Sequence, residues 1–324
     1  MGKLLDIKNL SVSFFTDYGE IRAVRNISFS VGPGEIYGIV GESGSGKSVS
    51  MKSVMRLTPD NCKIMSGNIL YDGKDLTKLT DKEFQSYRGR EMSMIFQDSL
   101  TALNPVYTIG SKLAELIRHI EKCSKKEAYS KSLSYLIEVG ISDPERCFNS
   151  YPHELSGGMR QRIMIAMAIA CHPRLIVADE PTTSLDVTIQ AQILKLLKNI
   201  CTKRRMSIIL ITHDFGAVAQ LCSKISVMCG GHIVETGSAE NIFLHPAHPY
   251  TKTLISSIPS TGRKFEPLLE PPEKKIAHDA LCPFLSRCKY SSSECMKQMP
   301  NIVETEPGHS VLCYKNNCEG KINE

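Results

Sequence analysis

The sequence lacks any long uninterrupted apolar run, although 42% of its 324 residues are hydrophobic. No window approaches the roughly 20 apolar residues that a membrane-spanning helix needs. The first residues, 1–6, contain no apolar block of the kind that a signal peptide carries. We therefore expect a chain that stays in the cytosol.

An excess of charge of one sign is absent as well. The formal net charge is only +5, and the basic residues are mixed with acidic ones rather than gathered into a tract. A solvated surface accounts for this pattern, so charge gives no case for nucleic-acid binding. Internal repeats are absent too. The length suits one large domain with a buried core and a smaller appendage, which argues against a disordered chain.

Cysteine, by contrast, is plentiful, with 12 residues. A cytosolic protein of this size keeps its thiols free or uses them to bind metal, whereas small secreted domains pair them. Most of the cysteines are scattered, and we interpret these as small packing residues. The remaining ones crowd the end of the chain: Cys282, Cys288, Cys295, Cys313 and Cys318.

The apolar pattern predicts an α/β fold. Apolar and polar residues alternate through 5–14 and 23–31, which indicates antiparallel strands. An apolar run at 36–40 is followed by a glycine-rich segment and then by helical spacing. Further apolar runs alternate with helical stretches, so we expect a mainly parallel sheet covered by helices. These runs lie at 175–178, 208–211 and 225–228.

Two segments depart from this pattern. Residues from about 98 to 170 have helical periodicity, with Leu133, Leu136 and Ile137 on one face, and we expect an inserted helical subdomain there. Near residue 256 the composition shifts to Pro, Glu and Lys, which indicates a linker into the cysteine-bearing tail. The expected domains are residues 1–255 and a C-terminal extension at 256–324.

A glycine-rich motif, GESGSGKS at 41–48, matches the P-loop pattern and lies between a predicted strand and a predicted helix. Glycines let backbone N–H groups converge on phosphate oxygens, and a helix N-terminus adds partial positive charge. We expect Lys47 to reach the β- and γ-phosphates of ATP and the Ser48 hydroxyl to ligate Mg²⁺. The expected phosphate-binding residues are Gly41, Ser43, Gly44, Ser45, Gly46, Lys47 and Ser48.

A second motif, LIVADE at 175–180, is typical of a buried strand that ends in two carboxylates. Asp179 is expected to hold Mg²⁺ through water. Glu180 is expected to orient or deprotonate the attacking water, because the γ-phosphorus needs an in-line nucleophile. To this point the residues predict a P-loop nucleotidase.

The octet LSGGMRQR at 155–162 resembles the LSGGQ signature of the ABC ATPase family, with Met159 in place of the glutamine. Ser156, Gly157 and Gly158 open a predicted helix whose N-terminus attracts anions. The resemblance implies a RecA-like P-loop core with an antiparallel β subdomain and the helical insertion. It also implies head-to-tail pairing, in which the signature of one subunit closes over ATP held by the other.

The same resemblance gives roles to further residues. Gln97, in MIFQD at 94–98, matches the Q-loop, which contacts Mg²⁺ and the attacking water and communicates with membrane subunits. His213 matches the switch histidine that contacts the γ-phosphate and supports Glu180. The catalytic set implied is therefore Lys47, Gln97, Glu180 and His213.

Two family elements concern the dimer seam and the adenine. Asp186, in SLD at 184–186, matches the D-loop at the seam. Tyr18 is our choice for the aromatic that stacks on adenine, and Phe15 is the alternative; either could instead belong to the core.

Sequence features outside the shared ATPase motifs resemble a smaller group within the family. ADEPTTSLDVT at 178–188 has the spelling typical of oligopeptide and dipeptide permease ATPases, and HPAHPYT at 245–251 resembles the segment that opens their C-terminal extension. This implies the ATP-hydrolysing subunit of a di- or oligopeptide importer, at the cytoplasmic face of the membrane. The implied partners are a second, related ABC ATPase subunit, two transmembrane permease subunits and an extracellular or periplasmic substrate-binding protein.

The tail cysteines lie in a proline-rich, helix-poor stretch without a substantial core, which bound metal could stabilise. In some peptide-importer ATPases such a tail resembles a ligand set for a 4Fe–4S cluster. Zinc is the alternative, weakened by the lack of paired C-x-x-C knuckles, and free thiols are the third interpretation. The expected ligands are Cys282, Cys288, Cys295 and Cys313, with Cys318 as a spare.

Two other functions stay open. An importer of nickel or another small solute has a similar ATPase. A soluble ABC protein acting on nucleic acid usually carries two cassettes or a long coiled-coil insertion, and this sequence has neither.

Overall fold

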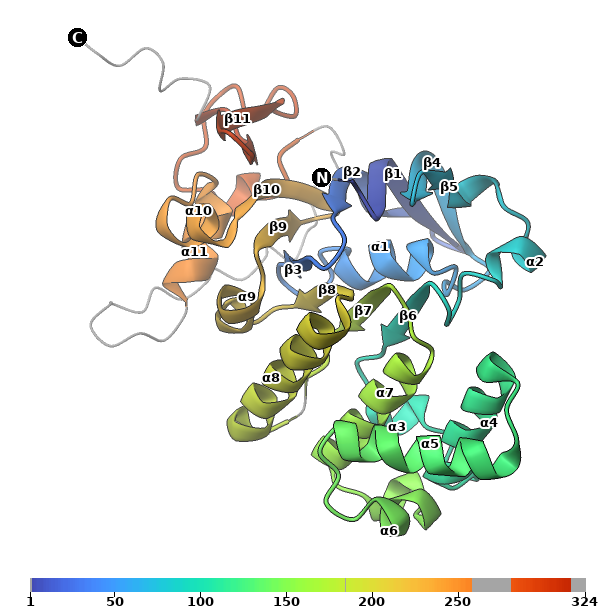
Figure 1. Cartoon of the computed structure of the whole chain (residues 1–324). Coiled ribbons are helices and arrows are strands. Elements are labelled where there is room, and N and C mark those ends of the chain that lie inside the picture. Colours follow the sequence, from blue (N-terminus) through green and yellow to red (C-terminus); the bar gives the residue numbers. More distant parts are fainter. Residues whose placement is uncertain (1, 184, 258–280, 316–324) are drawn as a thin grey trace. The chain divides into compact units, whose positions relative to one another are not determined.

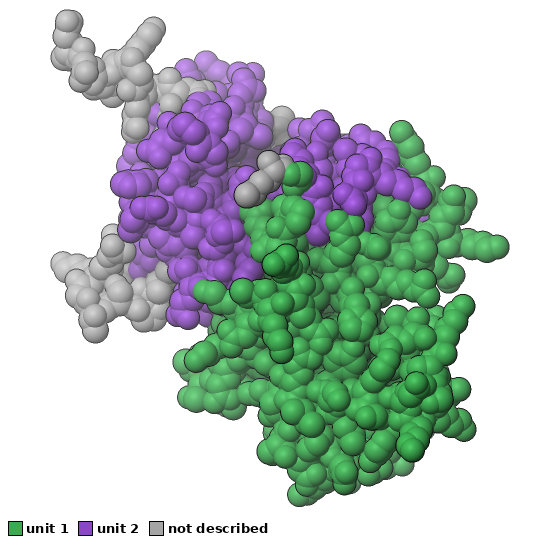
Figure 2. All heavy atoms as spheres, viewed as in Figure 1, with its two compact units in different colours: residues 1–2, 31–35, 76–211 green, residues 3–30, 36–75, 212–324 purple. Residues whose placement is uncertain are grey.

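A computed structural model of the chain describes residues 2–183, 185–257 and 281–315 (Figure 1). The chain divides into two compact units (Figure 2). The first unit comprises residues 1–2, 31–35 and 76–211, and the second unit comprises residues 3–30, 36–75 and 212–324. Within the described ranges, no helix combines the length and the apolar character that crossing a bilayer requires.

Parallel strands form the sheet of the first unit: β6 (Met92–Ile95), β7 (Leu175–Asp179) and β8 (Ser207–Thr212). β7 pairs with both of the others, and Leu175 lies opposite Met92 on one side and Ser207 on the other. Every residue of β7 and β8 is buried. Strands that are buried on both faces are apolar along their length, which is why the apolar runs predicted them correctly.

Helices make up most of the rest of the first unit, and the stretch from about residue 98 to 170 is helical as predicted. Side-chain caps start several of these helices; Thr108 accepts the Ser111 N–H, and Ser124 forms a capping box with Glu127. The helices are α2 (Asp81–Phe84), α3 (Ser99–Ala102), α4 (Ile109–Glu121), α5 (Lys125–Glu138), α6 (Pro144–Asn149), α7 (Gly157–Ala170) and α8 (Val187–Arg204), with short 3-10 turns at Leu76–Lys78 and Pro152–Glu154.

The predicted inner face of α5 was wrong at one position. Ile137 is 61% exposed, whereas Ala128, Ser132, Tyr135 and Leu136 are buried. Ser132 can occupy this face because its hydroxyl donates to the Ala128 carbonyl at 2.6 Å, inside the helix. The apolar pattern does not reveal a buried serine whose hydroxyl is hydrogen-bonded within its own helix. The buried face of α5 was therefore predicted one residue too close to the C-terminus.

The second unit contains an antiparallel sheet in the order β2-β1-β4-β5. β1 and β4 run antiparallel, with Leu5 opposite Tyr71 and Phe14 opposite Cys62. The alternating pattern predicted the strands β1 and β2, and the antiparallel β subdomain is the one that the family resemblance implied. The strands are β1 (Leu5–Thr16), β2 (Gly19–Val31), β4 (Cys62–Tyr71) and β5 (Lys74–Asp75).

The other strands of the second unit follow one another in the order β11-β12-β10-β9-β3. β3 and β9 are parallel, and the remaining pairs are antiparallel. The last two strands come from the cysteine-bearing tail and were not predicted. The strands are β3 (Ile36–Val40), β9 (Lys224–Cys229), β10 (His232–Ser238), β11 (Ile302–Glu306) and β12 (His309–Leu312); the helices are α1 (Lys47–Val54), α9 (Phe215–Leu221), α10 (Ala239–Leu244), α11 (Pro249–Ser256) and the 3-10 turn Leu285–Arg287.

A glycine near the start of α4 tests the packing of the helical segment. A Cβ at Gly110 would lie 2.2 Å from the ring of Phe148. Alanine is the better helix former, so propensity alone favours Gly110→Ala. We expect the opposite, a loss of about 1–3 kcal/mol of unfolding free energy from overpacking.

Denaturant unfolding of the full chain measures this loss. Gly110→Ala in a Phe148→Ala background is the matched control, because the ring that causes the clash is gone. An equal loss in both backgrounds would contradict the packing explanation.

Candidate functional site

The GESGSGKS segment forms a tight loop between β3 and α1 in the second unit. Its glycines at 41, 44 and 46 all have positive φ, at 152°, 76° and 100°. A Cβ at Gly41 would lie 2.1 Å from the Met228 carbonyl oxygen, and one at Gly46 would lie 2.4 Å from the Ala23 carbonyl oxygen. The loop therefore needs glycine at these two positions for space as well as for backbone conformation.

The lysine of the loop is buried inside it. Lys47 is 4% exposed, and its Nζ donates to the carbonyl oxygens of Gly41 and Glu42, both at 2.8 Å. Ser48 follows in the first turn of α1. The loop thus holds an ammonium group, a hydroxyl group and a helix N-terminus together, which is the chemistry that binds phosphate and its metal ion.

The carboxylates predicted at the end of β7 lie in the first unit. Asp179 is 1% exposed. Glu180 follows it with φ 47°, a left-handed conformation that is uncommon outside glycine. Its N–H donates to the Ile211 carbonyl at 2.9 Å, which holds the strained residue in place.

The side chain of Glu180 is held from two sides. Gln97 Nε2 donates to Glu180 Oε2 at 3.1 Å, and Thr183 Oγ1 donates to the same oxygen at 2.8 Å. The structure therefore brings together the predicted Gln97 and Glu180. Thr183 was missed, although it stands three residues after Glu180 in the motif that the sequence singled out.

The LSGG motif opens α7 in the first unit. Ser156 is the N-cap and accepts the Met159 N–H at 3.3 Å. A Cβ at Gly158 would lie 2.9 Å from Ile189, and one at Gly157 would lie 3.2 Å from Leu185. Larger side chains at these two positions would press on Leu185 and Ile189, so small residues suit the start of this helix.

Other predicted residues have simpler surroundings. Asp186 caps α8 by accepting the Ile189 N–H at 3.0 Å, and Ser184 lies outside the described residues. His213 follows β8 and is exposed. Tyr18 is fully exposed in the β1–β2 turn, while Phe15 is 42% exposed. Neither aromatic belongs to the core.

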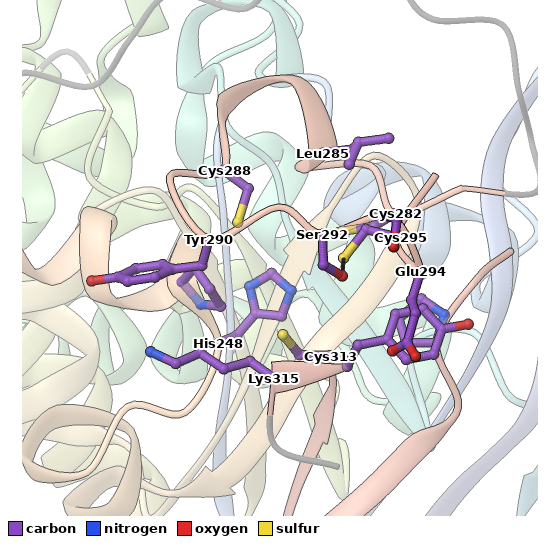
Figure 3. Close-up of a pocket in the computed structure, with 14 residues that line it drawn as sticks. His248, Cys282, Leu285, Cys288, Tyr290, Ser292, Glu294, Cys295, Cys313 and Lys315 are labelled. Atoms are coloured by element: carbon purple, nitrogen blue, oxygen red, sulfur yellow. Dashed lines mark hydrogen bonds between the residues drawn. The ribbon is translucent and has the colours of Figure 1, made fainter. Parts of the chain in front are cut away.

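The cysteines at 282, 288, 295 and 313 line one cavity of about 510 Å³ in the second unit. Figure 3 shows that the His248 imidazole lies among them. Burial, together with the charges that the other three thiols would carry, raises the pKa of Cys282 to about 12. Cys318 lies outside the described residues.

No group of three or more His, Cys, Asp or Glu side chains is placed to hold a metal ion in the part of the chain that the structure describes. The four cysteines are placed around the cavity described above.

His248, of the HPY segment, lines the same cavity. Its Nδ1 accepts the Tyr250 N–H at 3.0 Å, so the neutral ring carries its proton on Nε2. That atom is buried. Burial lowers the pKa of His248 to about 4, which Glu235 and the Leu312 backbone only partly oppose.

Comparison with known proteins identifies the family. Residues 24–183 match the ABC transporter family model, and residues 234–295 match the model of the oligopeptide/dipeptide transporter C-terminal region. The dipeptide transport ATP-binding protein DppD of Bacillus subtilis (strain 168) is 47% identical over 97% of this chain and 95% of that protein. The oligopeptide transport ATP-binding protein OppD of the same organism is 50% identical over 96% of this chain and 88% of that protein.

A solved structure supports the same assignment. A dimeric ATP-binding cassette, in a post-hydrolysis state bound to ADP and Pi, aligns with a TM-score of 0.65 and 27% identity, covering 72% of this chain and 98% of that one. The chain belongs to the family of ABC transporter ATP-binding proteins that carry the oligopeptide/dipeptide transporter C-terminal region. It has the ABC ATPase fold, and it is an ATPase that couples ATP hydrolysis to transport.

Substitutions at two loop glycines separate the need for space from the need for conformation. Gly46→Ala meets the Ala23 carbonyl oxygen at 2.4 Å, whereas a Cβ at Gly44 meets nothing within 4 Å. Both carry the left-handed penalty of about 1–2 kcal/mol. We expect Gly46→Ala to cost a further 1–3 kcal/mol or so in unfolding free energy and to abolish nucleotide binding.

Thermal unfolding and titration with a fluorescent ATP analogue measure the two effects. Gly44→Ala is the control and should lose less stability and less affinity. The packing account of the loop fails if the two variants behave alike.

Proposed function

We propose that this chain energises the import of di- and oligopeptides. The observation that carries the proposal is the joining, in one chain, of an ABC transporter family match at residues 24–183 to the C-terminal region of the oligopeptide/dipeptide transporters at residues 234–295. The names of the relatives support the same cargo, since both proteins described above act in peptide transport.

At the nucleotide, the loop of residues 41–48 would hold the phosphates through its backbone N–H groups. Lys47 would turn from the loop carbonyls toward the β- and γ-phosphate oxygens. Ser48, Gln97 and Asp179 would hold Mg²⁺, which neutralises charge that develops on the phosphates. Tyr18, with Phe15 as the alternative, would cover the adenine.

Glu180 would orient or deprotonate the attacking water. Its carboxylate already accepts hydrogen bonds from Gln97 and Thr183 on one oxygen, Oε2. His213 would support the γ-phosphate end of the site.

The assembly would contain a second, related ATPase subunit, two membrane-embedded permease subunits and an extracellular receptor for the peptide. Ser156, Gly157 and Gly158 would close over ATP held by the second ATPase, and Asp186 would lie at the seam. The chain would therefore lie on the cytoplasmic face of the membrane, attached through the permease subunits.

The removal of one charge tests the role of Glu180. Glu180→Gln keeps the shape and an acceptor for Thr183 but cannot take a proton. We expect ATP turnover to fall by at least about 100-fold, the range of a lost general base, while ATP binding is retained. Phosphate release and equilibrium binding measure the two properties; Glu145→Gln, the same change on an exposed turn of α6, is the control.

The cargo is tested in the reconstituted transporter. ATP-dependent uptake of labelled di- and oligopeptides should occur with the wild-type chain and stop with Glu180→Gln. Uptake of nickel or another small solute in place of peptide would overturn the proposed cargo. Rapid ATP cleavage by the Glu180→Gln variant would overturn only the role of that residue.

At the C-terminal cavity we propose a 4Fe–4S cluster bound by Cys282, Cys288, Cys295 and Cys313. One observation supports the fit: the four thiols line a single cavity, which His248 lines as well. Such a group supplies positive charge to the thiolates and cross-links a segment that has little core of its own. Zinc is the alternative, and the lack of paired C-x-x-C spacing among the tail cysteines weakens it.

Serine substitution tests the cluster directly. We expect each of Cys282→Ser, Cys288→Ser, Cys295→Ser and Cys313→Ser to lose iron and brown absorbance from anaerobically purified protein, because serine is a poor ligand for iron–sulfur clusters. Cys123→Ser, in the first unit, should keep both. Wild-type protein that contains no iron would refute the cluster, and zinc in its place would establish the alternative.

A further inference from the structure

One residue of the P-loop is held by the C-terminal region of the second unit. Arg287 donates to both carboxylate oxygens of Glu42, with Nη1–Oε1 at 2.7 Å and Nη2–Oε2 at 2.8 Å. The Glu42 N–H donates to the Tyr250 hydroxyl at 3.0 Å. Because Lys47 donates to the Glu42 carbonyl, side chain, N–H and C=O of residue 42 are all engaged.

The Arg287 contact is well shielded from solvent. The Arg287 side chain is 8% exposed and that of Glu42 is 28% exposed. The guanidinium also lies over the rings of Phe284 and Tyr250, at 5.1 and 5.8 Å from their centroids. A bidentate arginine–carboxylate pair fixes the orientation of the two side chains as well as their distance, which a lysine could not do.

Arg287 belongs to a short segment that lies between two of the cavity cysteines. The Leu285 N–H donates to the Cys282 carbonyl at 3.0 Å, and the Cys288 N–H donates to the Leu285 carbonyl at 3.3 Å. These turns make the position of Arg287 depend on the positions of Cys282 and Cys288. A shift of the backbone at either cysteine is therefore passed to the turn that carries Arg287.

The same segment touches the P-loop surroundings at a second place. Gly230 has φ 50°, and a Cβ there would lie 2.6 Å from Pro283, the residue that follows Cys282. The next residue, Gly231, donates its N–H to the Ser45 carbonyl at 3.0 Å. Two independent contacts thus run from the cysteine segment to the loop.

We propose that Arg287 is a positioning residue for nucleotide binding. Its ion pair with Glu42 holds the P-loop in the conformation that binds nucleotide, and it couples the occupancy of the cysteine cavity to ATP affinity. The coupling to cavity occupancy rests on the metal group proposed above. The positioning of the P-loop rests only on the contacts between Arg287 and Glu42. Arg287 touches neither phosphate nor metal in this role, because it acts through Glu42.

A double-mutant cycle in the full-length chain tests whether the Arg287–Glu42 pair supports nucleotide binding. We expect Arg287→Ala to weaken binding of a non-hydrolysable ATP analogue by about 3- to 10-fold, the scale of a lost charge-assisted pair. KM for ATP should rise with kcat nearly unchanged, because the chemical step does not involve the residue. In a Glu42→Ala background the same substitution should have no further effect.

A general structural role would give a different result. If Arg287→Ala weakens binding equally in both backgrounds, the proposal is overturned. Arg287→Lys, which keeps charge and bulk, guards against misfolding and should still lose most of the affinity that Arg287→Ala loses. Lys297→Ala, which removes an exposed cation from the same region, should leave affinity unchanged, and an equal loss there would also overturn the proposal.

A second experiment tests the coupling to the cavity. Anaerobic wild-type protein and Arg287→Ala are each titrated with the ATP analogue before and after iron is removed with a chelator. Removal should weaken binding in the wild type and have no further effect in Arg287→Ala. Unchanged wild-type affinity after proven loss of iron would overturn the coupling.

The failure of one proposal can be told from the failure of the other. If the purified wild type holds no metal, the cluster and its coupling to ATP affinity are both refuted. The double-mutant cycle still decides whether Arg287 holds Glu42, because it needs no metal.

Discussion

The phosphate-binding loop depends on contacts that hold residue 42 from outside the loop. Glycines at 41, 44 and 46 give the backbone many conformations in the unfolded chain. Fixing the loop in one conformation therefore has an entropic cost that contacts within the loop alone do not offset. Lys47 supplies one constraint from within, through the carbonyls of Gly41 and Glu42. Tyr250 and Arg287 supply the others, from the region beyond the motif set. The loop is therefore shaped by residues that the phosphate-binding motif does not contain.

The end of β7 is held in a different way. Glu180 occupies a left-handed conformation that costs about 1–3 kcal/mol in a residue with a side chain. A fully buried strand on one side and the Ile211 carbonyl on the other impose it. The strained backbone points the carboxylate toward Gln97 and Thr183. Two carboxylates in sequence, Asp179 and Glu180, thereby obtain different surroundings, one fully buried and one partly accessible, as two different roles require.

The sequence could predict what is encoded locally. Buried parallel strands are apolar along their length and phosphate loops are glycine-rich, so β7, β8 and the loop of residues 41–48 were found from short windows. Arg287 and Glu42 are 245 positions apart, and no period or motif links them. The tail strands β11 and β12 were missed for a similar reason: β11 is largely exposed and shows no apolar face, and β12 pairs with β10, which lies far from it in sequence. Ile137 was misplaced because Ser132 takes a buried position by bonding to its own helix.

The way in which the tail docks explains how Arg287 comes to the loop. Glu235 on β10 is 1% exposed and would be costly there without partners. It accepts from the Ala247 N–H at 2.7 Å, the His248 N–H at 2.9 Å and His309 Nε2 at 2.7 Å. These bonds fix the residues that lead into α11, and the first residue of β12, to one point on β10. A slip in the register of β12 would leave the buried Glu235 carboxylate without one of its partners. Cys313 directly follows β12, so the tie at β12 holds this end of the cysteine segment against β10, and β10 belongs through β9 to the same sheet as β3, the strand that leads into the P-loop.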